Sequence, residues 1–138
     1  MSSTIVPTLR YSDARAAIDW LCRAFGFQRR LVVEGEGGAI AHSQLVLGTG
    51  MVMVGPAYEG VLEPLVVPPE RTAGVTTQSV YVIVQDVAAH FEHAVNSGAA
   101  VVMAPADQPY GGRLYTCRDL EGHVWHFGSY DPWSADGP

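Results

Sequence analysis

Two stretches of the chain share one pattern of apolar and polar positions. Residues 8–27, TLRYSDARAAIDWLCRAFGF, and 80–99, VYVIVQDVAAHFEHAVNSGA, each read as a short apolar strand, an aspartate and an amphipathic segment that ends at glycine. Asp13 and Asp86 stand where a helix N-cap is expected, because their carboxylates can accept N–H groups of the first turn. Apolar residues then recur at i, i+3, i+4 and i+7, which indicates one buried helix face. The pattern therefore predicts two copies of a strand–helix unit.

Three short strand-like runs follow each predicted helix. They are LVVEGEG, IAHSQLVLG and MVMVGPA in the first half, and AVVMAP, GRLYTCRD and HVWHFGSY in the second. Glycines and turn residues separate the runs, as is typical of β-strands. We therefore expect an α+β fold built from two βαβββ modules, residues 1–57 and 77–131, within one domain. The remaining residues form a tail, 132–138.

The proline-rich segment 58–76 joins the two modules. It contains several prolines and shows no helical or strand period. Such a segment is too long for an idle connection within a domain, so we expect a lid, a crossover or a dimer contact.

Composition narrows the functional classes. The 138 residues are 48% hydrophobic and 16% charged, and the latter is below the roughly 25% typical of soluble domains. Part of the surface is therefore expected to be covered, most simply in a homodimer. A net charge of −6 with scattered basic residues argues against nucleic-acid or anionic-membrane binding.

The sequence also bears on the cellular location of the protein and on the state of its cysteines. The N-terminus has no apolar signal segment, and the apolar runs are too short to span a bilayer. Cys22 and Cys117 match neither a metal-binding spacing nor a disulfide framework. We therefore expect a cytoplasmic protein.

Three motifs together resemble the vicinal oxygen chelate superfamily, which includes glyoxalases, bleomycin-resistance proteins, fosfomycin-resistance transferases and extradiol dioxygenases. They are the strand–Asp–helix–FGF start at 8–27, YGGR at 110–113 and RDLEGHVWHF at 118–127. Pro7, near the start of the first strand, resembles the PhnB-like branch. The resemblance implies that the two modules pair into a curled eight-stranded mixed sheet around a cavity, with the helices outside.

The resemblance also implies four metal-ligand positions. In this chain they fall on Val6, Val54, Ser79 and His126. A catalytic divalent ion needs three or four His, Glu or Asp ligands, so a single imidazole is not enough. We therefore expect no metal and no cofactor. The glyoxalase and dioxygenase mechanisms, which need a bound metal, are accordingly not expected.

Two histidines lie close together in RDLEGHVWHFGSYDP. Strand alternation places His123 and His126 on opposite faces, because their numbers differ by an odd count. His123 is expected to belong to the turn and His126 to the cavity, where it either contacts a ligand or is a hydrogen-bonded group of the wall. His42 and Gln44 share the inward parity, and an atypical metal site would require His42 and His126 to converge.

Apolar walls with a few polar groups are typical of a small-molecule pocket. The residues expected to line it are Val6, Thr8, His42, Gln44, Val52, Val54, Ser79, Tyr81, Thr116 and His126. Arg113 lies with Tyr110 in the loop at the predicted cavity mouth. It either clamps a ligand carboxylate or phosphate, or pairs with Asp107 or Asp119.

We therefore predict a metal-independent protein that binds a partly apolar or aromatic small molecule. Sequestration of a toxic metabolite or antibiotic is the role implied by the likeness to bleomycin-resistance proteins. The alternative is a glyoxalase-like lyase or isomerase with an atypical metal site.

Overall fold

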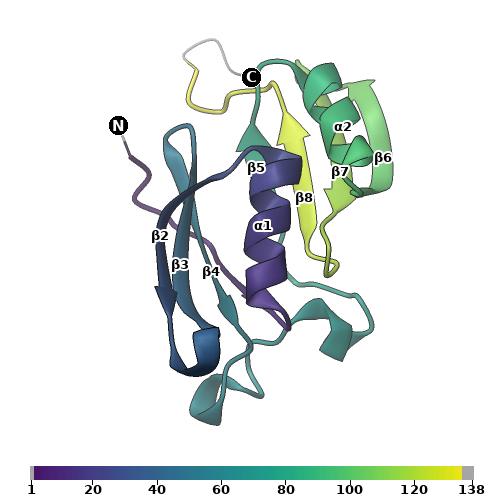
Figure 1. Ribbon diagram of the computed structural model, residues 1–138. Helices are drawn as coiled ribbons and strands as arrows, with labels where there is room; N and C mark the ends of the chain where they lie inside the picture. The colour runs from purple at the N-terminus through teal and green to yellow at the C-terminus, as the bar shows by residue number, and fades with distance from the viewer. Residues whose placement is uncertain (1, 135–138) are drawn as a thin grey trace.

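The computed structural model describes residues 2–134, and within them the chain forms two α-helices and eight β-strands (Figure 1). The elements are β1 (Thr8–Tyr11), α1 (Ala14–Phe25), β2 (Gln28–Glu34), β3 (Ile40–Leu47), β4 (Gly50–Pro56), β5 (Val80–Ile83), α2 (Val87–Asn96), β6 (Ala100–Asp107), β7 (Arg113–Arg118) and β8 (Val124–Gly128). The predicted α+β class is confirmed.

The strands form two four-stranded mixed sheets instead of one continuous sheet. Sheet A has the order β1-β4-β3-β2 and sheet B the order β5-β8-β7-β6. In each sheet the first pair, β1–β4 or β5–β8, is parallel and the other pairs are antiparallel. The two halves of the chain therefore have the same topology, which matches the repeat in the sequence.

Both helices begin at the predicted aspartates. The Asp13 carboxylate accepts the N–H of Ala16 at 3.1 Å, and the Asp86 carboxylate accepts the N–H of Ala89 at 3.0 Å. Gly26, which follows α1, has φ 92°, a left-handed conformation that glycine adopts without a Cβ clash. The helix limits are therefore set by local sequence signals.

The aromatic core joins the two halves of the molecule. The Phe25 ring of α1 lies 5.2 Å from the ring of Trp125 and 4.7 Å from that of Phe127, both in β8. The Trp20 Nε1–H donates to the carbonyl of Ser97, beyond the end of α2, at 2.8 Å. Helix α1 therefore packs against sheet B and α2 as well as its own sheet, and Figure 1 shows it between the two sheets.

Strand alternation leaves the other side of each sheet more exposed. In β8, Trp125 and Phe127 are fully buried against the helices, whereas His126 between them is only partly buried. In β3, Ser43 is fully buried and its neighbour His42 is partly exposed. We call the side of each sheet that faces away from this helical core its open face.

The segment between the two halves packs against the body of the protein. It contains the 3-10 turns Gly60–Leu62 and Pro69–Thr72, and Pro69 is buried. The Arg118 guanidinium of β7 donates to the carbonyl of Gly74 at 2.8 Å. In the described residues no helix is long and apolar enough to cross a membrane.

Candidate functional site

A chain of three polar side chains lies on the open face of sheet B. The register pairs His126 with Thr116 on one side and with Tyr81 on the other, so these side chains share a face. His126 Nδ1 is 2.8 Å from Thr116 Oγ1, and His126 Nε2 is 2.8 Å from Ser79 Oγ. Four of the predicted site residues are therefore gathered here.

His126 is suited to neutral hydrogen bonding. Burial lowers the pKa of its imidazole, because removal from water disfavours the charged form. Each ring nitrogen faces a hydroxyl group, and a hydroxyl can donate or accept, so either neutral tautomer satisfies both contacts. The exposed Ser79 hydroxyl stands at the outer end of this chain. A ligand on the open face would therefore meet an uncharged donor and acceptor.

A hollow of about 320 Å³ lies beside Tyr81. Its walls are Tyr81, Tyr110, Tyr130 and Pro132. The Tyr81 hydroxyl donates to the carbonyl of Tyr130 at 2.7 Å, and the Tyr110 and Tyr130 rings meet edge to face with centroids 5.1 Å apart. Burial raises the pKa of Tyr81, so its phenol stays protonated. Aromatic rings in this arrangement suit a flat apolar group.

Gly128 makes room for the Tyr81 ring. A Cβ at this position would lie 2.5 Å from the Tyr81 hydroxyl oxygen and 3.0 Å from two ring carbons. The position therefore needs glycine if Tyr81 is to lie across the end of β8.

A second group of predicted site residues lies on the open face of sheet A. Thr8 and Gln44 both pair with Met53, so their side chains share that face. Gln44 Nε2 is 3.2 Å from His42 Nε2, and Val6 lies partly buried just before β1. Within residues 2–134, no hydrogen bond joins this group to the His126 group. The predicted residues therefore form two clusters, one on each sheet.

The prediction that Val52 and Val54 line the same face is wrong. Val54 is fully buried in the helical core and pairs with Leu9, and Val52, 3% exposed, pairs with Leu45. A shift of one residue moves a side chain to the opposite face of a strand. Met53 therefore takes the place that the sequence pattern gave to Val54.

The internal repeat also indicates that Met53, and not Val54, lies on the open face of sheet A. Thr8 pairs with Met53 in sheet A, as Tyr81 pairs with His126 in sheet B. The four family ligand positions are therefore held by Val6, Met53, Ser79 and His126. This donor set has one imidazole, one thioether and no carboxylate, which does not fit a catalytic divalent metal. In the described part of the chain, no group of three or more His, Cys, Asp or Glu side chains is placed to hold a metal ion.

The fold agrees with a comparison against protein families. The sequence model of the Glyoxalase/Bleomycin resistance protein/Dioxygenase superfamily matches residues 4–127. The chain belongs to this superfamily.

Three known proteins are similar to this chain over most of its length. The crystal structure of TioX from Micromonospora sp. ML1 is 38% identical, with a TM-score of 0.74, covering 92% of this chain and 98% of TioX. An uncharacterised protein of Mycobacterium tuberculosis strain H37Rv is 33% identical over 122 residues, 88% of this chain and 71% of the relative. The match to TnmS3, an antibiotic binding protein from Streptomyces sp. CB03234, covers 93% of this chain and 97% of TnmS3, with a TM-score of 0.69. At 20% sequence identity, this match shows a shared fold alone.

His123 and Arg113, which the sequence analysis also considered, contact other parts of the protein. The His123 Nε2–H donates to the backbone carbonyl of Arg10 at 2.7 Å, so His123 holds the β7–β8 turn against β1. Arg113 Nε lies 3.2 Å from Asp107 Oδ1 on the surface. Of the two alternatives for Arg113, the structure shows the ion pair with Asp107, and a ligand clamp stays a prediction.

Sequence reasoning missed one residue of the open face of sheet A. Arg10 is only 8% exposed and lies two positions after Thr8, with the same parity. The signal was an arginine between the apolar residues Leu9 and Tyr11 in a strand otherwise suited to burial. Tyr58, which covers this guanidinium, lies in the next segment of the chain and has no readable pattern.

Proposed function

We propose that this protein binds a partly aromatic small molecule without a metal, and that its role is to sequester a toxic metabolite or an antibiotic. The observation that carries the proposal is the Ser79–His126–Thr116 chain beside the three-tyrosine hollow. Apolar walls with a few well-placed polar groups are the usual composition of small-molecule sites. The neutral imidazole and the hydroxyl groups favour an uncharged polar group on the ligand at this point.

Two proteins of similar fold support the proposed role as precedents. TnmS3 is an antibiotic binding protein, and FosX of Listeria monocytogenes, with a TM-score of 0.66 and 12% identity, is a fosfomycin resistance protein. The proposal takes from them only that this fold accommodates antibiotic binding and resistance. The donor set gives no support to the alternative of a metal-dependent lyase or isomerase.

We extend the proposal to a homodimer in the cytoplasm. Large apolar side chains on the open faces are half exposed, namely Leu31, Val33, Ile83 and Met103. A second copy would bury them, since extended apolar patches on soluble proteins usually mark contact sites. Both cysteines are free thiols, which suits a reducing compartment.

A thermal-shift screen of flat aromatic metabolites and antibiotics tests the binding function. We expect at least one compound to stabilise the protein, by about 2.7 kcal/mol at a concentration of 100 times Kd. The Tyr81→Ala and His126→Ala variants should reduce this stabilisation, because they remove the hollow wall and the polar chain. Leu120→Ala, at an exposed position in the β7–β8 turn, is the matched control and should leave it unchanged.

Removal of metal ions by a chelator tests whether ligand binding is independent of metal. Binding of the same compound should be unchanged after dialysis against EDTA, because no metal is required. A silent screen, or a hit that binds Tyr81→Ala, His126→Ala and Leu120→Ala equally, contradicts the proposed site. A hit lost after chelation contradicts metal independence.

A further inference from the structure

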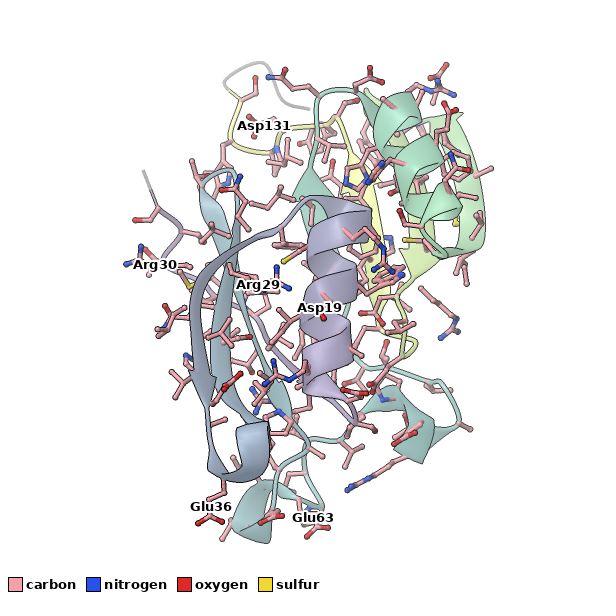
Figure 2. The ribbon with its side chains drawn as sticks, viewed as in Figure 1. Asp19, Arg29, Arg30, Glu36, Glu63 and Asp131 are labelled. Carbon is pink, nitrogen blue, oxygen red and sulfur yellow. The ribbon has the colours of Figure 1, made fainter. Side chains whose placement is uncertain are left out.

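The open face of sheet A contains a buried arginine without a carboxylate partner. Arg10 is 8% exposed, and among the described residues no Asp or Glu lies within ion-pairing distance of its guanidinium. The ion-paired arginines behave differently: Arg29, for example, pairs with Asp19 on the exposed side of α1 (Figure 2). Buried charges in proteins are normally paired, because removing an unpaired charge from water is costly.

Two groups lie close against the Arg10 guanidinium. One is the backbone of Gly55, its partner in the β1–β4 register, where a Cβ would come within 2.7 Å of Nη1 and 3.0 Å of Cζ. The Tyr58 ring also lies against the guanidinium, with Arg10 Cζ 4.2 Å from the ring centroid. The N–H groups that can form hydrogen bonds lie along the edges of the guanidinium.

Those edges are poorly satisfied. A guanidinium has five N–H groups. The hydrogen bond found for it within residues 2–134 runs from Nη1 to the carbonyl of Pro56, at a long 3.3 Å. Arg10 Nε is buried with no partner in the described part of the chain. An unsatisfied buried donor destabilises the folded protein, so the arrangement favours a partner that the described part of the chain does not supply.

An oxyanion supplies what is missing. A carboxylate or phosphate group presents two oxygens in the geometry of a guanidinium edge and brings the absent negative charge. Thr8, two residues earlier on the same face, adds a neutral hydroxyl beside the arginine. The contacts with Gly55 and Tyr58 restrict the guanidinium in advance, which reduces the entropy lost on binding.

We propose that Arg10, held against Gly55 and Tyr58, is an oxyanion subsite, and that the small molecule bound by this protein carries a carboxylate or phosphate group. This inference rests on the proposed binding function and adds the charge class of the ligand.

NMR titration with benzoate tests the subsite, with benzamide as the uncharged analogue of the same shape. Benzoate should shift the Nε–H resonance of Arg10 and bind at least tenfold more tightly than benzamide. Inorganic phosphate in a third titration distinguishes the two oxyanions: the tighter of benzoate and phosphate identifies the class that the subsite prefers.

The variants are Arg10→Lys and Arg10→Gln, with Arg15→Gln as control, since Arg15 is exposed and paired with Glu34. Both Arg10 variants should lose at least tenfold in benzoate affinity, because lysine lacks the planar fork and glutamine lacks the charge. The control should change it less than twofold. If the Arg10 variants do not fold, the wild-type comparison of benzoate with benzamide decides alone.

The possible results separate this inference from the proposed function. Equal binding of benzoate and benzamide, or benzoate binding unchanged in Arg10→Gln, overturns the oxyanion subsite while an aromatic screening hit still supports small-molecule binding. No binding of benzoate or phosphate to the wild type overturns the subsite too. A silent aromatic screen together with tight, Arg10-dependent benzoate binding overturns the tyrosine hollow and leaves the subsite standing.

Discussion

Asp119 is the residue through which the β7–β8 turn is attached to the core. One carboxylate oxygen accepts the backbone N–H groups of Glu121, Gly122 and His123, at 3.1, 3.0 and 3.0 Å. The other oxygen accepts the Trp125 Nε1–H at 2.9 Å and the Tyr11 hydroxyl. The residue is only 6% exposed, so the negative charge is stabilised by five donors instead of by a cation.

Asp119→Asn is expected to lower the free energy of unfolding by about 2–4 kcal/mol, because the amide nitrogen would face donors and leave at least one unsatisfied. The matched control is Asp19→Asn on the exposed side of α1, where loss of the Arg29 ion pair should cost about 1 kcal/mol or less. Urea unfolding followed by tryptophan fluorescence measures both. Equal losses in the two variants would show that the five hydrogen bonds contribute little.

At the scale of elements, α2 completes the C-terminal end of α1. The last carbonyls of a helix have no partner within it. The His90 Nε2–H donates to the carbonyl of Phe25 at 2.9 Å, and His90 Nδ1 is 2.6 Å from the Tyr115 hydroxyl. His93 Nε2 lies 2.7 Å from the carbonyl of Arg23. The contact between the two helices therefore depends on imidazoles as well as on apolar packing.

This contact gives the fold a pH dependence. Burial is the main cause that lowers the pKa of His90, against the opposing effect of its bond to the Phe25 carbonyl. Above the unfolded pKa of about 6.5, His90 is neutral in both states and has no effect. As pH falls below it, the unfolded chain takes up the proton first, so stability declines until the native pKa is reached.

We expect urea unfolding between pH 7.5 and 5 to show this decline, and His90→Gln to make it shallower at the expense of some stability at pH 7.5. His126, whose pKa is also lowered, contributes the part of the slope that remains. Tyr115→Phe is the control, because it removes the hydroxyl partner but keeps His90 buried, so its slope should stay as in the wild type. An identical slope in His90→Gln and the wild type contradicts this explanation.

The elements were predictable from the sequence where local signals fix them. Asp13 and Asp86 mark helix starts because the capping bond is made within one turn, and alternation around Trp125 and Phe127 correctly places His126 on the other face. The register of β4 was not predictable in this way. It follows from the pairing of β4 with both β3 and β1, whereas the spacing implied by the family resemblance placed Val54 on the wrong face.

At the scale of the whole molecule, the sequence shows the repeat but not how its halves meet. The core that joins them depends on Phe25 lying against sheet B, and the cover of Arg10 depends on where Tyr58 comes to lie. Both are contacts between distant segments without a periodic pattern. For the same reason, two clusters of site residues on separate sheets could not be distinguished from one shared cavity.

The exposed apolar residues of the open faces lead to a prediction of assembly. Leu31 on sheet A and Ile83 on sheet B are each 43% exposed. A stable interface buries at least about 1,000 Å², which two curved sheet faces can provide. We expect light scattering after gel filtration to give twice the chain mass, and Leu31→Glu or Ile83→Glu to give the monomer with an unchanged circular dichroism spectrum.

Two further variants locate the interface. Leu120→Glu, at an exposed position in the β7–β8 turn, should remain dimeric, and Val61→Glu tests the proline-rich segment, where Val61 is 85% exposed. If only Val61→Glu dissociates the dimer, the contact lies on that segment and the open faces stay free for ligand. If the wild type is monomeric at every concentration, the half-exposed side chains of each open face remain in water, and the predicted homodimer is contradicted.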